Sequence, residues 1–235
     1  MGYKRFKFRH KETIVTILVE DERYYDIAVK AILKARREIE NFISKDPFFL
    51  TALEPYDCDV DRGIVKRMCR AAKIAGVGPM ASVAGAIAGY AVEEVIKAGA
   101  RFVVIDNGGD IAVSSDRELT IGIYPTNLAF RISGKICICT SSGKIGHSIS
   151  FGYADAVTIF AEDCCIADAF ATALANEIKE DFKQKEIEET LRRFWKKAKD
   201  YVEGAIVVKD ECIGFIGNIP EIVEAKVSYD LITKG

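Results

Sequence analysis

The sequence predicts an α+β fold with a mostly antiparallel sheet and grouped helices. Strand-like runs occur in adjacent pairs, at residues 3–9 and 13–20 and again at 204–209 and 212–216. The helical patterns lie in groups between such pairs and do not alternate with single strands, which disfavours a repeating βαβ order. No repeat, low-complexity tract or Pro/Gly/Ser-rich linker interrupts the chain, so we expect residues 1–235 to form a single domain.

The amino-terminal part begins with a hairpin and continues with helices. The polar residues 10–12 lie between the first two strands and suit a short turn. Apolar residues then recur at three- and four-residue steps over residues 25–42, which predicts an amphipathic helix that stops before Pro47. Two more helices are expected at residues 61–75 and 80–98, separated by a segment with two glycines and a proline.

Short strands dominate the middle of the chain, and helices return after them. We expect strands at residues 101–106, 111–113, 119–124, 128–133, 135–140 and 156–161. Ser133-Gly134 is interpreted as the turn of a hairpin. The remaining expected elements are helices at about 165–180 and 185–202, the paired strands 204–209 and 212–216, and a last strand-like run at 222–229.

Composition and charge argue against two classes of partner. Lys plus Arg number 33 against 35 Asp plus Glu, and the formal net charge of -2 gives no long-range attraction to phosphate backbones or anionic lipid. No apolar stretch is long enough to cross a bilayer, and the amino terminus lacks the apolar core of a signal peptide. We therefore expect a cytoplasmic protein that binds neither nucleic acid nor membrane.

The seven cysteines are odd in number and lack the C-x-x-C spacing typical of metal sites. Most of them lie in apolar strand or helix patterns, so we expect reduced, largely buried thiols. Cys164 and Cys165 are adjacent, and such a pair can perform redox or sulfur-transfer chemistry when one member is an exposed thiolate. Buried packing is the alternative for this pair.

Two loops carry groups suited to anion binding. In Asn107-Gly108-Gly109-Asp110, glycines allow positive φ and leave backbone N–H groups uncovered, although a tight turn explains the same residues. Thr140-Ser141-Ser142-Gly143-Lys144 offers three hydroxyls, a glycine and a cation for contacts with phosphate or another oxyanion. The second loop does not have the P-loop order of residues, so nucleotide hydrolysis of that type has no support.

Three further side chains are candidates for chemistry. His147 lies in a glycine-containing segment, where its imidazole could act as a general base or could be structural. Asp168 and Thr172 are four residues apart in an otherwise apolar helix and therefore project from one face. A buried lone carboxylate costs several kcal/mol, so a cation is a sensible occupant, and oxygen ligands favour magnesium. Alternatively, Asp168 caps a helix or pairs with a lysine.

In order along the chain, five segments resemble those of the ApbE family, whose characterised members are FAD:protein FMN transferases. The five segments are Gly85–Glu93, Asn107–Ile111, Ile121–Pro125, Thr140–Gly143 and Asp168–Ala173. They correspond to the family's small-residue helix, its G-G-D-I turn, a following strand, its T-S-G segment and its D-A-x-A-T-A helix. His147 falls where the family has the histidine of its H-x-I-D-P loop.

The resemblance implies a single α+β domain that binds FAD and magnesium. Magnesium would be held by Asp168, Thr172 and a backbone carbonyl near Gly85, and it would neutralise charge on the FAD pyrophosphate. The implied catalytic residues are His147, which would assist proton transfer, and Asp168. A hydroxyl of an acceptor protein would receive FMN while AMP leaves, or water would cleave FAD. The implied flavin-binding residues are Gly108, Gly109, Asp110, Thr140, Ser141, Ser142 and Gly143.

The chain departs from the family pattern at three places. Ala88 stands where the family has lysine, Glu93 stands where it has aspartate, and the histidine loop is reduced to residues 147–152. Residues 76–81 and 146–148 resemble a short cytoplasmic branch of ApbE-like proteins that is associated with sulfur assimilation and homocysteine formation.

These observations support four hypotheses. The first is a magnesium-dependent flavin enzyme, and the second is a non-catalytic flavin- or nucleotide-binding module. The third is a sulfur-assimilation accessory protein that uses Cys164 and Cys165. The fourth is an oligomeric structural protein that uses the small-residue helix as its interface.

Overall fold

The computed structural model describes residues 2–123, 126, 128–143 and 152–224. Its helices are α1 (Arg23–Lys45), α2 (Phe48–Thr51), α3 (Ile64–Ala75), the 3₁₀ helix η1 (Pro79–Ser82), α4 (Val83–Lys97), α5 (Cys164–Glu177) and α6 (Gln184–Ala198). Its strands are β1 (Lys4–His10), β2 (Thr13–Val19), β3 (Phe102–Asn107), β4 (Asp110–Gly122), β5 (Leu128–Ser141), β6 (Ala156–Ala161), β7 (Gly204–Lys209), β8 (Cys212–Gly217) and β9 (Glu221–Glu224). The short helix α2 was not expected from the sequence.

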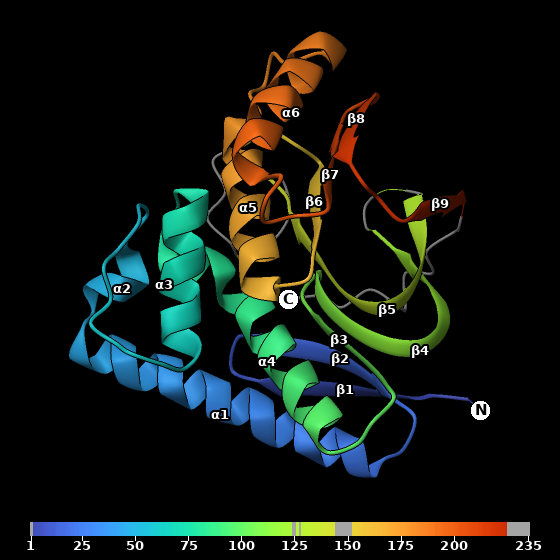
Figure 1. The fold of residues 1–235 in the computed structure, drawn as a ribbon. Helices are drawn as coiled ribbons and strands as arrows, with labels where there is room; N and C mark the ends of the chain where they lie inside the picture. Colours follow the sequence, from blue (N-terminus) through green and yellow to red (C-terminus); the bar gives the residue numbers. More distant parts are fainter. Residues whose placement is uncertain (1, 124–125, 127, 144–151, 225–235) are drawn as a thin grey trace.

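All of these strands belong to one antiparallel sheet. The order runs from β1 to β8 as in the sequence, and β9 pairs with the first half of β5 (Figure 1). The helices come in two groups, α1 to α4 between β2 and β3, and α5 with α6 between β6 and β7. The predicted α+β class, with a mostly antiparallel sheet and grouped helices, is confirmed.

The predicted hairpin at Ser133-Gly134 is wrong, because β5 continues through these residues as one strand. Gly134 has a φ of 78° and lies opposite Ser115, next to a shift in the β4–β5 register between Ser115 and Leu119. A glycine with positive φ beside such an irregularity bends a strand without reversing it. The two long strands curl strongly as a result, as Figure 1 shows for β4 and β5.

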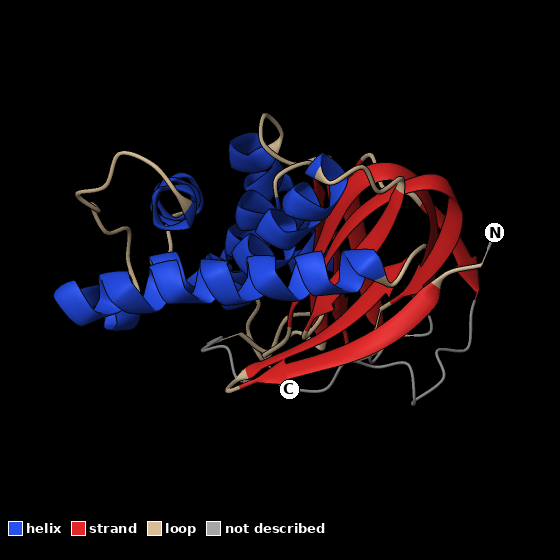
Figure 2. Cartoon of the chain, turned by 90° about the horizontal axis from the view of Figure 1, so that it is seen from below, coloured by secondary structure: helices blue, strands red, loops and turns tan. Residues whose placement is uncertain are grey.

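The sheet separates two cores, because successive side chains of a strand point to opposite faces of the sheet. The helix-side core contains Ile105, Cys139 and Ile159 together with the buried faces of the helices. Among the described residues, the other core contains none from a helix, and it includes Phe130 and Phe160, whose ring centroids are 5.0 Å apart. Figure 2 shows the helices gathered on one side of the sheet. Asp168, Thr172, Asn107 and Asp110, which are described below, lie between the sheet and the helices.

Within the described residues, no single helix is long and apolar enough to cross a membrane. The pair Ile64–Ala75 and Pro79–Lys97, bent by 105°, passes that test by length and composition only.

Candidate functional site

Asp168 lies at the contact between α5 and the start of α4. Its side chain is buried, and its Oδ2 accepts a hydrogen bond of 2.8 Å from the backbone N–H of Gly85. A Cβ atom added to Gly85 would lie 2.5 Å from the carbonyl oxygen of Cys164 and 2.8 Å from the Cβ of Asp168. The two helices can approach this closely only because residue 85 is a glycine.

The carboxylate of Asp168 acts as the cap that α4 does not supply for itself. The N-cap residue Ser82 makes no capping hydrogen bond, because its hydroxyl donates to the carbonyl of Pro79 at 2.9 Å. The first N–H groups of a helix need acceptors, and a negative charge is favoured there. The helix α5 is capped by Asp163, so Asp168 caps a neighbouring helix and not its own.

Thr172 lies one turn further along α5 on the same face as Asp168. Its hydroxyl donates to the carbonyl oxygen of Ala81, the last but one residue of η1, at 3.4 Å. Both side chains therefore point toward the η1–α4 segment, which confirms that they share one face.

The turn between β3 and β4 places two polar side chains on the helix side of the sheet. Gly108 and Gly109 have φ angles of 71° and 104°, so the tight-turn interpretation holds. The N–H of Gly109 donates to Asp106 Oδ1 at 2.9 Å and is therefore not uncovered, contrary to expectation. Asn107 and Asp110 lie opposite each other in the register.

Asn107 is a site residue that the sequence reasoning did not select. Its side-chain Nδ2 donates to the carbonyl oxygen of Ala84 at 3.0 Å, and the residue is buried. The available signal was a carboxamide at the end of an apolar strand, directly before two glycines. A buried amide needs a partner, and that partner is the first turn of α4.

Asp110 and Asp168 are two buried carboxyl groups that interact electrostatically. Burial, and then the negative charge of Asp168, raise the pKa of Asp110 well above its ordinary value. Burial raises the pKa of Asp168 to about 7, against the opposing effect of the Gly85 and Ala84 amides. Two carboxylates in one desolvated space disfavour each other's ionisation, so the site holds a proton or attracts a cation.

The Thr140–Gly143 segment divides between the two faces of the sheet. The Thr140 hydroxyl is 2.9 Å from the Thr158 hydroxyl, on the face away from the helices, and only its backbone N–H reaches Asp110 Oδ1, at 3.2 Å. Ser141 lies on the helix face, 5% exposed, and its Oγ has no hydrogen-bond partner among the residues that the structure describes. The structure thus brings Ser141, but not the Thr140 hydroxyl, to the side of the sheet that carries Asp110.

Gly143 and Gly152 enclose the predicted histidine segment. The N–H of Gly143 donates to the carbonyl of Ala154 at 3.0 Å, and a Cβ on Gly143 would lie 1.7 Å from the Gly152 carbonyl oxygen. The two ends of the segment therefore lie against each other. His147 itself, Lys144 and the predicted family positions 124 and 125 lie outside the described residues.

The prediction of reduced thiols is wrong for four of the cysteines, which form disulfides Cys58–Cys69 and Cys137–Cys164. Spacing along the chain could not reveal this, because β5 and the first turn of α5 meet only in the fold. Cys165 is free and buried, and burial raises the pKa of its thiol well above the ordinary value. Neither member of the adjacent pair is an exposed thiolate, which disfavours the thiol-chemistry alternative.

Removing the Cys137–Cys164 bond is expected to lower stability by about 3 to 4 kcal/mol, the loop-entropy value for a separation of 27 residues. The double variant Cys137→Ser/Cys164→Ser should show this loss in urea unfolding. Cys212→Ser, at a partly exposed free cysteine, is the control and should change little. An unchanged double variant would mean that this disulfide does not stabilise the fold.

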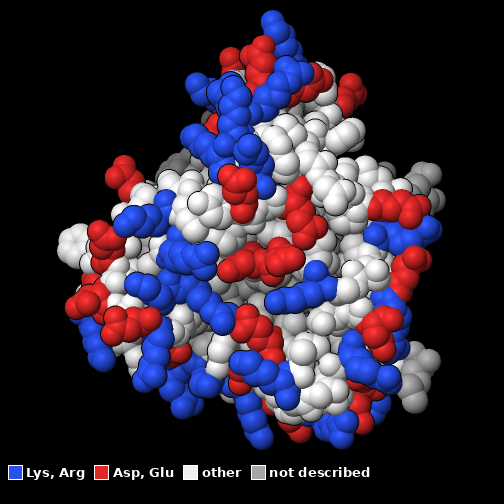
Figure 3. Space-filling view, in the orientation of Figure 1, with Lys and Arg blue, Asp and Glu red and all other residues white. Residues whose placement is uncertain are grey.

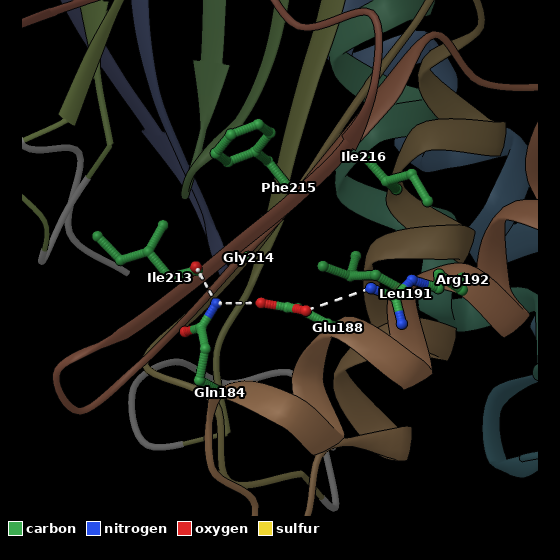
Figure 4. Close-up of a pocket in the computed structure, with 8 residues that line it drawn as sticks. All are labelled: Gln184, Glu188, Leu191, Arg192, Ile213, Gly214, Phe215 and Ile216. Atoms are coloured by element: carbon green, nitrogen blue, oxygen red, sulfur yellow. Dashed lines mark hydrogen bonds and ion pairs between the residues drawn. The ribbon is translucent and has the colours of Figure 1, made fainter.

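A groove of about 220 Å³ lies elsewhere, between α6 and β8 (Figure 4). Gln184 donates to Glu188 Oε1 and to the carbonyl of Ile213, each at 3.0 Å, and Arg192 pairs with Glu188 at 3.3 Å. No residue predicted from the sequence lines this groove.

Figure 3 shows basic and acidic side chains intermixed on the viewed face, in agreement with the small net charge.

The donor atoms at the α4–α5 contact fit a hard divalent cation. They are the Asp168 carboxylate, the Thr172 hydroxyl and the Ala81 carbonyl, and all of them are oxygens. Within the described part of the chain, no group of three or more His, Cys, Asp or Glu side chains could hold a metal. Backbone oxygens would therefore have to complete the ligand set. Gly85 meets Asp168 through its N–H, and the metal role of a carbonyl near it stays a prediction.

Curated proteins match this chain over almost its whole length. The UPF0280 protein of Archaeoglobus fulgidus is 58% identical and spans 99% of this chain and 100% of its own length. The UPF0280 protein of Methanothrix thermoacetophila is 46% identical and spans 97% of this chain and 98% of its own length.

Solved structures share the fold at low sequence identity. The apo flavinyl transferase ApbE of Pseudomonas stutzeri has a TM-score of 0.57 at 11% identity and covers 100% of this chain and 98% of its own. The apbe protein of Thermotoga maritima has a TM-score of 0.55 at 11% identity, with 100% of both chains covered. The family model described as AbpE bacteria matches residues 1–210, and the chain belongs to this ApbE-like family.

Proposed function

We propose that this chain binds FAD together with magnesium and cleaves the FAD pyrophosphate, so that AMP leaves and FMN passes to an acceptor protein or to water. The observation that carries the proposal is the buried Asp168 carboxylate, which meets the η1–α4 segment together with the Thr172 hydroxyl. Two solved relatives in fold are described as flavin or flavinyl transferases. Membership of an ApbE-like family supports the same chemistry.

Asp168 and Thr172 would hold the metal, together with a carbonyl oxygen of the η1–α4 segment. When bound there, the ion would supply positive charge that offsets the negative charge of the pyrophosphate. The N–H of Gly85 keeps the Asp168 carboxylate in place, and the buried setting keeps water from screening the charges.

The proposed flavin contacts use the two glycine-containing loops. Ser141 supports this assignment, because its buried hydroxyl has no partner within the described part of the chain and could donate to a phosphate oxygen. Gly108 and Gly109 would allow close approach of the ligand to the turn. Asp110, Ser142 and the backbone of Thr140 and Gly143 complete the proposed set. His147 is proposed to assist proton transfer from the attacking hydroxyl.

A binding-only function is the second candidate, and the family departures favour it. Ala88 stands where the family has lysine. It is fully buried in α4, and its methyl side chain cannot supply the positive charge of that lysine. Glu93, where the family has aspartate, forms a bidentate ion pair with Arg67 at 2.7 and 3.0 Å. This acid thus links α3 to α4, and a role in the reaction is not required to explain it.

Purified protein incubated with FAD and MgCl₂ is expected to release AMP and FMN, measured by chromatography, and EDTA should abolish the release. The rate should fall on the order of 100-fold in Asp168→Asn, because the proposed metal loses its charged ligand. Asp200→Asn, at an exposed residue of the α6–β7 connection, should react like the wild type. FAD binding by calorimetry without product, with or without candidate acceptor proteins, would select the binding-only function. Absence of any flavin binding would refute both.

A further inference from the structure

The peptide unit between Ala84 and Gly85 is held from both sides by side chains of different elements. Asn107 Nδ2, at the end of β3, donates to its carbonyl oxygen at 3.0 Å. Asp168 Oδ2, on α5, accepts from its N–H at 2.8 Å. A single peptide plane therefore links the sheet, α4 and α5.

This linkage fixes a direction, because a peptide unit is planar and its C=O and N–H point opposite ways. A donor that holds the carbonyl of Ala84 also determines where the N–H of Gly85 points. The side chain of Ser82 gives this helix start no cap, so side chains from other elements supply the polar contacts that hold this peptide.

Asn107 is itself held rigidly. It is paired with Val15 on β2 and with Asp110 on β4, and it is only 7% exposed. A buried carboxamide with few rotamer choices is a suitable support for a ligand group, because its own position is determined by packing. Asparagine supplies the required N–H donor, whereas an aspartate or leucine of similar size would not.

We propose that Asn107 is a positioning residue that orients the Ala84–Gly85 peptide, and through it the Asp168 carboxylate, for a divalent cation. The inference rests on the proposed function, because it assumes that Asp168 is a metal ligand. Asn107 does not touch the cation in this arrangement. Its effect passes through one peptide plane and one hydrogen bond.

The test measures metal binding directly, with Mn²⁺ as a paramagnetic substitute for Mg²⁺. Free Mn²⁺ is followed by electron paramagnetic resonance in the wild type, Asn107→Leu and Asn107→Gln, and Mg²⁺ competition verifies the site. We expect Asn107→Leu to weaken Mn²⁺ binding about 10-fold or more, the usual range for a residue that supports a ligand. Asn107→Gln keeps an amide donor and should recover part of the affinity. Asn41→Leu, on the exposed face of α1, is the control.

The outcomes separate this inference from the function on which it rests. Wild-type protein that binds no Mn²⁺ would overturn both. Wild-type binding with an unchanged affinity in Asn107→Leu would overturn the positioning role alone, as would equal losses in Asn107→Leu and Asn107→Gln. If Asn107→Leu does not fold, Asn107→Ser, whose shorter side chain falls short of the Ala84 carbonyl, is judged by the same criterion.

Discussion

Asp168→Asn is expected to raise the free energy of unfolding of the metal-free protein at pH 8, by up to about 4 kcal/mol. The pKa of the native carboxyl group is about 7, whereas an unfolded aspartate titrates near ~4. Ionising it in the folded state therefore costs stability at high pH, and asparagine removes that cost. The amide oxygen of asparagine can still accept from the Gly85 N–H.

The sign of the pH dependence follows from the raised pKa. Between about pH 4 and pH 7 the unfolded chain has lost this proton while the native protein retains it, so wild-type stability falls as the pH rises. Above the folded pKa the slope from this group vanishes. Burial and the charge of Asp168 also raise the pKa of Asp110, so this residue contributes in the same direction. Asp168→Asn should flatten this dependence.

The measurement is urea unfolding in EDTA at pH 5 and pH 8, with Asp200→Asn as the exposed control. Added MgCl₂ should stabilise the wild type at pH 8, because a ligand that binds only the native state shifts unfolding. It should not stabilise Asp168→Asn. If Asp168→Asn is less stable than the wild type at pH 8, the charge of Asp168 stabilises the start of α4 by more than its burial costs.

Gly85→Ala is expected to destabilise the protein by about 2 to 3 kcal/mol and to weaken metal binding. The new methyl group would meet the Cys164 carbonyl at 2.5 Å, and backbone in a packed helix cannot move aside cheaply. The gain of up to about 1 kcal/mol in helix propensity does not offset this. Separation of α4 from α5 would also lengthen the hydrogen bond from the Gly85 N–H to Asp168 Oδ2.

Gly89→Ala is the matched control one turn further along α4. A Cβ atom there would lie 3.0 Å from the Cβ of Cys164 and 3.2 Å from its Sγ, a tighter contact than usual but without the 2.5 Å overlap. We expect a change within about 1 kcal/mol, because the propensity gain opposes the crowding. Thermal unfolding of both variants tests the comparison. Equal losses of stability in the two variants would mean that the close approach of α4 and α5 at residue 85 does not cause the destabilisation.

Local patterns in the sequence were sufficient for most elements. Periodicity of apolar residues predicted α1, helical patterns on either side of a Gly- and Pro-containing break predicted α3 and α4, and strand-like runs predicted the strands at both ends of the chain. The prediction of a hairpin at Gly134 failed because a glycine with positive φ occurs both in a bend within a strand and in a turn between strands. Only the pairing of Gly134 with Ser115 distinguishes the two cases. The prediction of reduced thiols failed for a related reason. Cysteines that are separated in the sequence and come together only in the fold leave no local signal.

The sequence by itself determined the fold class, the family and the shared face of Asp168 and Thr172, because helical spacing is a local property. Only the tertiary structure decided what that face meets. It showed that Asp168 caps α4 and lies near a second buried carboxyl, Asp110. It also separated the Thr140 hydroxyl from Ser141 and introduced Asn107 as a partner of the Ala84 carbonyl. These contacts join residues 18 or more positions apart, so the packing of the strands with α4 and α5 determines them and no sequence interval does.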